Sequence, residues 1–164
     1  CGIDEDATKI MINARDRSLF LQARHSMPAN SLEVVQRRGT YTIMTDTVVP
    51  EYRFEEFLKN NHDLLKAENL DYLSFGHLGD CHLHFMVLPE KTQLTRATQV
   101  YEKIIERSAI LGGVYSGEHG TGKRKRDDFL KCYGSGAVEQ VRLAKITVDP
   151  DFLLNRGNVI MYQK

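Results

Sequence analysis

Three histidines lie close together in the middle of the chain, and their spacing could support metal chemistry. A Gly-Asp turn signal separates His77 from His82 and His84, and apolar segments flank the group on both sides. This pattern predicts a hairpin that brings His77 near the other two. His82 and His84 would share a face, because strand side chains alternate. Converging neutral imidazoles suit a divalent ion such as zinc or manganese, whereas a lone histidine at a hairpin tip is usually an ordinary surface residue.

A glycine-rich segment, Ser-Gly-Glu-His-Gly-Thr-Gly-Lys at 116–123, is the second group of residues with chemical potential. Its three glycines let the backbone turn sharply and approach a ligand closely. The carboxylate of Glu118 can ligate a metal, and His119 can exchange protons near neutral pH. The segment is therefore a candidate second half of the histidine site.

The same segment contains the pattern G-x-x-x-x-G-K, which is part of a phosphate-binding loop. The next residue is Arg124, where Mg²⁺ binding would require Ser or Thr, so the nucleotide interpretation is disfavoured. The basic run 123–126 is interpreted as a solvated surface, with an anionic substrate or another domain as alternatives. Nucleic acid is not expected as a partner, because no aromatic residues are interleaved with the basic run.

The composition fits one soluble globular domain of 164 residues, with 41% hydrophobic and 27% charged residues. Lys plus Arg equals Asp plus Glu, at 22 each, so no polyanionic partner is indicated. No apolar run is long enough for a transmembrane segment. Three cysteines without a C-x-x-C pair indicate a reducing compartment. The expected location is cytoplasmic. Because the chain opens on Cys1, we expect a fragment of a longer chain.

The elements that would position these residues follow the order β-α-β-β-α-β. This order predicts an α+β fold, a ferredoxin-like antiparallel sheet with helices on one face, and a helix near 137–146 forms a C-terminal helical extension. Upstream, 15–25 has helical spacing that Pro28 should limit, and 8–13 fits either a strand or a helix. The expected elements are strands at 40–49, 70–77, 82–88 and 114–116, and helices at 50–67 and 95–111.

Three motifs occur in a recognisable order: the histidine cluster, the Ser-Gly-Glu-His-Gly segment, and the ending at 149–160. Together they resemble the C-terminal domain of FAD-linked oxidases. These are the D-lactate, D-2-hydroxyglutarate and glycolate dehydrogenase relatives in the vanillyl-alcohol oxidase superfamily. The resemblance covers about residues 24–160.

The resemblance implies a substrate and metal domain that works beside an N-terminal FAD-binding domain of the same chain. In such enzymes a small 2-hydroxy acid passes a hydride to FAD. The resemblance also implies an electron-acceptor partner, which gives a location peripheral to a membrane as the alternative to a cytoplasmic one. By motif position the divalent metal, Zn or Mn, would be held by His77, His84 and Glu118. His119 would be the catalytic base that takes the hydroxyl proton. The isolated chain should be inactive, because hydride transfer belongs to the cofactor.

The resemblance also assigns substrate and cofactor contacts, with some departures from the family pattern. Arg24 resembles the arginine that holds the substrate carboxylate, and a guanidinium suits that role. Asn155 matches an asparagine near the flavin, although Arg156 replaces the proline that follows it in the family. His82 stands where the family has a substrate-facing asparagine, so it could take that role or compete as a ligand. Met44 stands where some members have a substrate-binding lysine, which argues against a dicarboxylate.

Two other classes of function remain open from the sequence. One is a free-standing divalent-metal-binding domain, or a metal-dependent hydrolase that uses metal-bound water. The other is a non-catalytic interaction domain of ferredoxin-like topology. The segment 154–155 discriminates between them and the oxidoreductase, because it has a role only beside a flavin.

Overall fold

The computed structural model describes residues 10–161 and divides into two compact units, Cys1–Gly39 and Thr40–Lys164. The first contains one long helix, α1 (Ala14–Arg38), capped by the Asn13 side chain and ended by Gly39 in the left-handed conformation. The helix continues through Pro28, so the expectation that this proline limits it is wrong. An interior proline costs one backbone donor, and here the capped helix tolerates that loss. Of the segment 8–13, residues 8–9 lie outside the described part, and 10–12 form no regular element.

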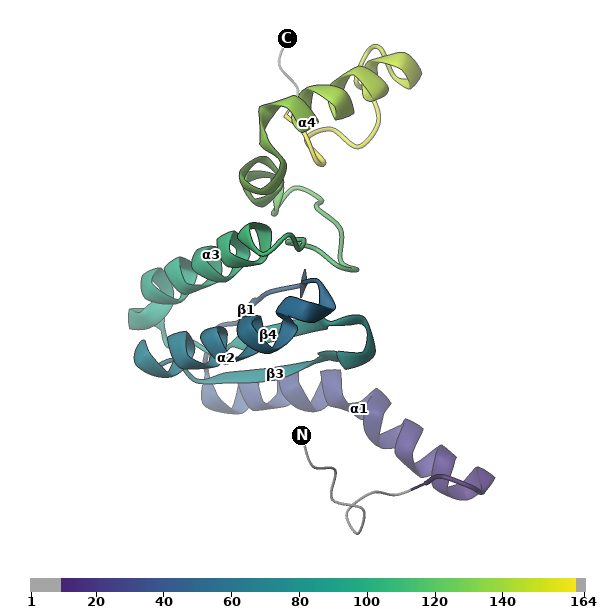
Figure 1. The fold of residues 1–164 in the computed structure, drawn as a ribbon, viewed down its shortest axis with the longest axis vertical. Helices are drawn as coiled ribbons and strands as arrows, with labels where there is room; N and C mark the ends of the chain where they lie inside the picture. Colours follow the sequence, from purple (N-terminus) through teal and green to yellow (C-terminus); the bar gives the residue numbers. More distant parts are fainter. Residues whose placement is uncertain (1–9, 162–164) are drawn as a thin grey trace. The chain divides into compact units, whose positions relative to one another are not determined.

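The sheet of the second unit is built around β4 (His82–Val87), with an antiparallel strand along each edge (Figure 1). β3 (Tyr72–His77) pairs along one edge through the short 3₁₀ turn η1 (Leu78–Asp80), which confirms the predicted hairpin. β1 (Ile43–Met44) and β2 (Thr47–Val48) pair in turn with the other edge, in one continuous register. The strand expected at 40–49 is therefore two short pieces.

Segment 114–116 lies beside β2 and completes the sheet. Isolated bridges join Val48 to Val114 and Asp46 to Ser116. The order across the sheet is therefore 114–116, then β1 with β2, then β4, then β3. This is the arrangement expected of a ferredoxin-like fold, and the α+β prediction is confirmed.

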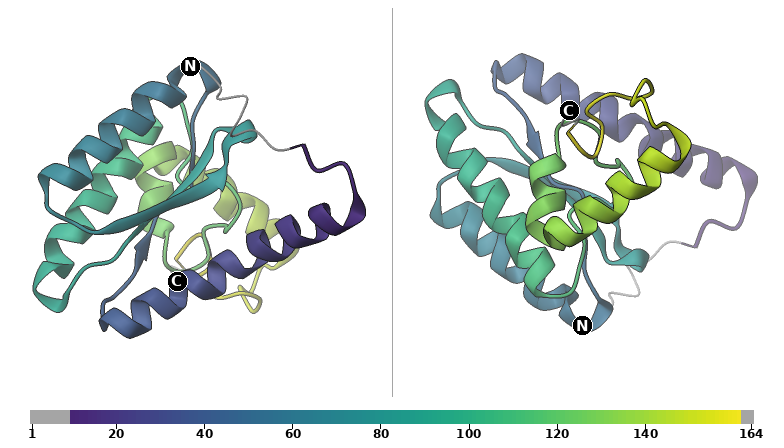
Figure 2. Two further views of the ribbon diagram at one scale, coloured as in Figure 1. Left: turned by 90° about the horizontal axis from the view of Figure 1, so that it is seen from below. Right: turned by 90° about the horizontal axis from the view of Figure 1, so that it is seen from above.

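Helices α2 (Glu51–Ala67) and α3 (Leu94–Ile110) lie side by side and pack on the sheet, as the turned views in Figure 2 show. The turn η2 (Lys91–Gln93) precedes α3. The core joins Phe57 of α2 and Ile104 of α3 to alternate residues of β4, including Phe85. Because side chains alternate along a strand, His82 and His84 belong to the opposite face of the sheet. The fold thus separates the core face from the histidine face.

The C-terminal helix α4 (Arg126–Val148) begins eleven residues before the predicted start at 137, as its bounds show. Gly134 interrupts it with φ 77° and ψ 174°, a conformation that a side chain would strain. The helix is thus two helical pieces joined at a kink. Among residues 10–161, no helix combines the length and the apolar composition needed to cross a membrane.

Candidate functional site

The hairpin places two of the predicted residues opposite each other. His77 at the end of β3 is the register partner of His82 at the start of β4. Their rings are stacked, with centroids 5.5 Å apart and planes 16° apart. The His84 ring approaches His82 edge-on, at 4.6 Å between centroids. The predicted convergence of the three histidines is therefore present.

The glycine loop, which we define as residues 116–122, lies over this histidine face. A Cβ added to Gly117 would lie 2.9 Å from His82 Nε2 and 2.7 Å from Val48 Cγ2. Only glycine lets the backbone come this close without displacing its neighbours. The close approach places the next two residues, Glu118 and His119, beside the imidazoles.

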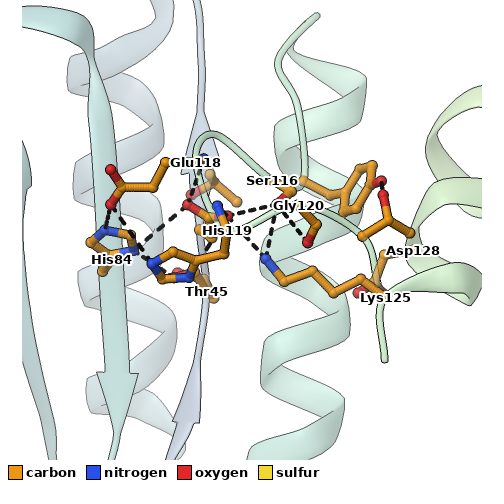
Figure 3. A network of polar contacts seen from close by, with 12 residues as sticks. Thr45, His84, Ser116, Glu118, His119, Gly120, Lys125 and Asp128 are labelled. Atoms are coloured by element: carbon orange, nitrogen blue, oxygen red, sulfur yellow. Dashed lines mark hydrogen bonds and ion pairs between the residues drawn. The ribbon is translucent and has the colours of Figure 1, made fainter. Parts of the chain in front are cut away.

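Glu118 lies between two of the histidines and uses a different oxygen toward each. Its Oε1 is 3.0 Å from His84 Nε2 (Figure 3). Its Oε2 is 3.7 Å from His77 Nε2. The hydrogen bond with His84, together with the fields of the neighbouring histidines, lowers the pKa of Glu118 below its usual range. The carboxylate is therefore ionised at neutral pH.

The tautomer of His84 follows from its other nitrogen. Nδ1 lies 2.9 Å from the main-chain oxygen of Thr45, which can only accept, so Nδ1 carries a hydrogen. A neutral His84 then presents the Nε2 lone pair to the carboxylate of Glu118, and two acceptors cannot bond directly. A proton or a metal cation must lie between them. Donation of the second ring nitrogen to a carbonyl is the usual arrangement of a metal-ligating histidine.

Neither ring nitrogen of His119 has a hydrogen-bond partner among the described residues. Nδ1 is 3.8 Å from Asp46 Oδ2, and Nε2 is 3.7 Å from Glu118 Oε1, both beyond hydrogen-bond distance. The ring stacks on His84, with centroids 4.9 Å apart and planes 8° apart. An exposed imidazole with free nitrogens can accept a proton from a bound molecule.

Asp46, between β1 and β2, is the main site residue that the sequence analysis missed. Its carboxylate is fully buried. Burial raises its pKa, but hydrogen bonds from Ser116, the His119 amide, Lys125 and His82 outweigh burial and hold the pKa of Asp46 well below its usual range. The available signal was an acidic residue within an apolar, β-branched strand.

Lys125 corrects the interpretation of 123–126 as a solvated surface. Its side chain is only 15% exposed, and Nζ lies 3.0 Å from both Asp46 Oδ2 and Ser116 Oγ. Arg126 is half-buried and donates a hydrogen bond to the main-chain oxygen of Gly157. The expectation holds for Lys123 and Arg124, which are exposed. Spacing within a basic run does not reveal which cation meets a buried carboxylate.

A cleft of about 860 Å³ opens beside the glycine loop. Residues of β1 and α3 line it, and His119 is among the lining residues. Besides the loop, its lining includes Met44, Tyr101, Lys123 and Arg124. The arrangement offers room for a small polar molecule next to the free imidazole.

Five of the seven predicted site residues meet on the histidine face: His77, His82, His84, Glu118 and His119. The other two come from other segments of the chain. Arg24 is an exposed residue of α1, in the unit Cys1–Gly39. Asn155 is exposed in the segment after α4, with a left-handed φ of 43°.

Known proteins match this chain over most of its length. The family model described as FAD linked oxidases, C-terminal domain, matches residues 4–159. The glycolate oxidase subunit GlcD of Bacillus subtilis is 26% identical over 159 residues, which cover 94% of this chain and 33% of that protein. A mitochondrial D-lactate dehydrogenase [cytochrome] of Kluyveromyces lactis is 31% identical over 115 residues, 70% of this chain and 20% of that protein. The chain thus spans about a third or less of these relatives.

A solved structure shares the fold at low sequence identity. The 4-ethylphenol oxidase of Gulosibacter chungangensis, in an isoeugenol complex, aligns with a TM-score of 0.50 and 13% identity. The alignment covers 76% of this chain and 25% of that one. The match of the family model over residues 4–159 identifies the chain as a member of the FAD linked oxidases, C-terminal domain, family.

Proposed function

We propose that this chain is the substrate- and metal-binding domain of an FAD-dependent dehydrogenase that oxidises a small 2-hydroxy acid of the D-lactate or glycolate type. The observation that carries the proposal is the position of Glu118 between His84 Nε2 and His77 Nε2. Family membership and the names of the matched relatives support the reaction class. A longer chain with an N-terminal FAD-binding domain fits the share of those relatives that these residues cover.

The donor set of the histidine face fits a divalent ion such as Zn or Mn. Two imidazoles and one carboxylate are the ligands of catalytic zinc sites that leave a position open for substrate. By motif position His77, His84 and Glu118 would hold the ion, and the Thr45 carbonyl fixes the orientation of His84. The ligand atoms that lie within 4.8 Å of one another form two sets that share Glu118: one with His77 and His82, the other with His84, His119 and Asp46. A bound ion would supply polarisation of the substrate hydroxyl.

The C-terminal segment fits a position beside a flavin. Leu153 and Leu154 are both exposed, and Asn155 follows them with an exposed amide group. Apolar side chains next to a single amide suit the edge of a planar ring. FAD, when bound, would be the acceptor of the hydride from C2 of the substrate.

The remaining steps belong to residues of this chain. His119 would take the proton of the C2 hydroxyl on one of its free ring nitrogens. His82 would face the substrate with Nδ1, because its Nε2 lies 2.9 Å from Asp46 Oδ1 and donates to it. Arg24 would bind the substrate carboxylate through its guanidinium fork. Cys81 and Cys132 are free thiols, which fits a reducing, cytoplasmic compartment.

Metal titration tests the carrying observation. Calorimetry with Zn²⁺ and Mn²⁺ should give one site in the 164-residue chain. The double variant His77→Ala, His84→Ala should lose that site, and the exposed His25→Ala on α1 should keep it. Unchanged binding in the double variant would sink the assignment.

Activity tests the rest of the proposal. The isolated chain should be colourless and inactive, because FAD binding is assigned to another domain. A purified chain that holds stoichiometric FAD and oxidises a hydroxy acid would refute that assignment. In the longer protein, His119→Ala should lower kcat roughly 10²–10⁴-fold, with flavin spectrum and metal content unchanged. A loss below about fivefold would leave His119 as a structural residue.

A further inference from the structure

Three consecutive main-chain N–H groups of the glycine loop converge on one residue. Gly117 N donates to the main-chain oxygen of Asp46 at 2.7 Å. Glu118 N lies 3.3 Å from Asp46 Oδ1, and His119 N lies 2.9 Å from Asp46 Oδ2. The last two are successive N–H groups aimed at one carboxylate, and such a pair forms a nest, the arrangement that phosphate-binding loops use.

Two side chains complete this nest. Ser116 Oγ donates to Asp46 Oδ2 at 2.6 Å, and Lys125 Nζ lies 3.0 Å from the same oxygen (Figure 3). A hydroxyl, an ammonium group and backbone amides are also the groups that hold phosphates in G-x-x-x-x-G-K loops. The likeness to the partial motif is one of chemistry and not of position, because the ammonium group belongs to Lys125 and not to the exposed Lys123 of the motif, and the anion is a carboxylate of the same chain.

We propose that the glycine loop is an anion-binding nest whose ligand is the Asp46 carboxylate, and that Asp46 is the positioning residue that holds Glu118 and His119 over the histidine face. The nest stands independently of any metal. Only the roles of Glu118 and His119 rest on the proposed function.

The number of hydrogen bonds that Asp46 accepts also argues against a role for it as a metal ligand. A carboxylate oxygen of Asp46 lies within 4.8 Å of a ring nitrogen of His84, a ring nitrogen of His119 and a carboxylate oxygen of Glu118, which would suggest Asp46 as a further metal ligand. Five donors already use the two oxygens, including His82 Nε2 at 2.9 Å. A carboxylate offers about four lone-pair directions, so a cation could bind Asp46 only by displacing these donors. Asp46 therefore acts through the loop and is not itself a metal ligand.

The assignment predicts that a free carboxylate can replace the missing one. Asp46→Gly removes the anion and leaves space next to the nest. In the 164-residue chain, amide exchange at 117–119 should quicken at least tenfold, and Zn²⁺ affinity should fall about 10–100-fold, as for other groups that support metal ligands. Added formate should restore both in a saturable manner, whereas formamide, which is neutral, should restore neither.

The controls separate the nest from the proposed function. Asp80→Gly, in the exposed turn η1, should change neither exchange at 117–119 nor the formate response. If Asp46→Gly does not fold, Asp46→Asn keeps the volume and should still speed exchange at 118 and 119. Unchanged exchange in a folded Asp46 variant, or rescue by formamide equal to that by formate, would overturn the proposal. A wild-type chain that binds no metal would refute the proposed function, while the exchange result would still decide the nest.

Discussion

Replacing Lys125 with methionine isolates the charge that compensates the buried Asp46. Methionine keeps most of the aliphatic stem and removes the ammonium group, which lies 3.0 Å from both Asp46 Oδ2 and Ser116 Oγ. Asp46 is fully buried, so its charge cannot recover the lost partner by moving into water. We expect Lys125→Met to destabilise the chain strongly.

The magnitude follows from the geometry. At 3.0 Å and an effective dielectric constant of about 20, the gross Coulomb attraction is about 5.5 kcal/mol. Removing one partner of a buried ion pair typically costs about 3–5 kcal/mol, because the other charge stays buried. Four donors to Asp46 remain in the variant, from His82, Ser116 and the two loop amides. The low end, about 3 kcal/mol, is therefore the expected loss.

Urea unfolding followed by circular dichroism measures this loss, since the chain has no tryptophan to follow by fluorescence. Lys123→Met is the matched control two positions away, and its exposed side chain should change the unfolding free energy by less than about 0.5 kcal/mol. In an Asp46→Asn background, the cost of Lys125→Met should fall below about 1 kcal/mol, because the carboxylate is gone. Equal costs for Lys125→Met and Lys123→Met would refute the reasoning.

Three smaller changes test other parts of the structure. Gly117→Ala should weaken metal binding at least tenfold by calorimetry, because its Cβ would lie 2.9 Å from His82 Nε2 and displace the loop. Asn61→Leu should stabilise the chain by about 1–2 kcal/mol in urea, since the Asn61 side chain is 1% exposed and its amide has no hydrogen-bond partner within residues 10–161. The pKa of Asp149 is lowered because Lys145 hydrogen-bonds to it. Its ionised carboxylate accepts hydrogen bonds from the amides of 153 and 154. The stabilisation that these bonds give is present above pH about 4 and is lost as the pH falls below that. NMR of those amides should show the loss in wild type, and in Asp149→Asn at every pH.

The hairpin was predictable because its signals are local. A turn signal between two apolar segments fixes the connection, and strand alternation then places His82 and His84 on one face. The order of helices and strands also followed from periodicity, and the ferredoxin-like arrangement follows from that order. Pro28 shows the limit of a local rule, because a helix with good caps can continue through a proline that usually ends one.

The centre of the site was not predictable in the same way. Asp46 and Lys125 are 79 residues apart, and no spacing rule joins them. Each looked ordinary in its own segment, one as a polar residue in a strand and the other as one cation among four. Their pairing exists only because the sheet places segment 114–116 beside β2, so that the glycine loop begins where Asp46 faces it.

This dependence explains why the reactive residues were easier to find than the residue that orders them. Histidines and a glutamate are conspicuous because few other side chains can bind metal or exchange protons at neutral pH. A positioning carboxylate is conspicuous only through its donors, and those come from β4, the glycine loop and the start of α4. If Asp46 orders the loop as proposed, its loss should disturb Glu118 and His119 together, whereas loss of His77 should leave the loop amides protected. Amide exchange in His77→Ala therefore provides the contrast, and quickened exchange at 117–119 in that variant would place control of the loop in the histidine cluster instead.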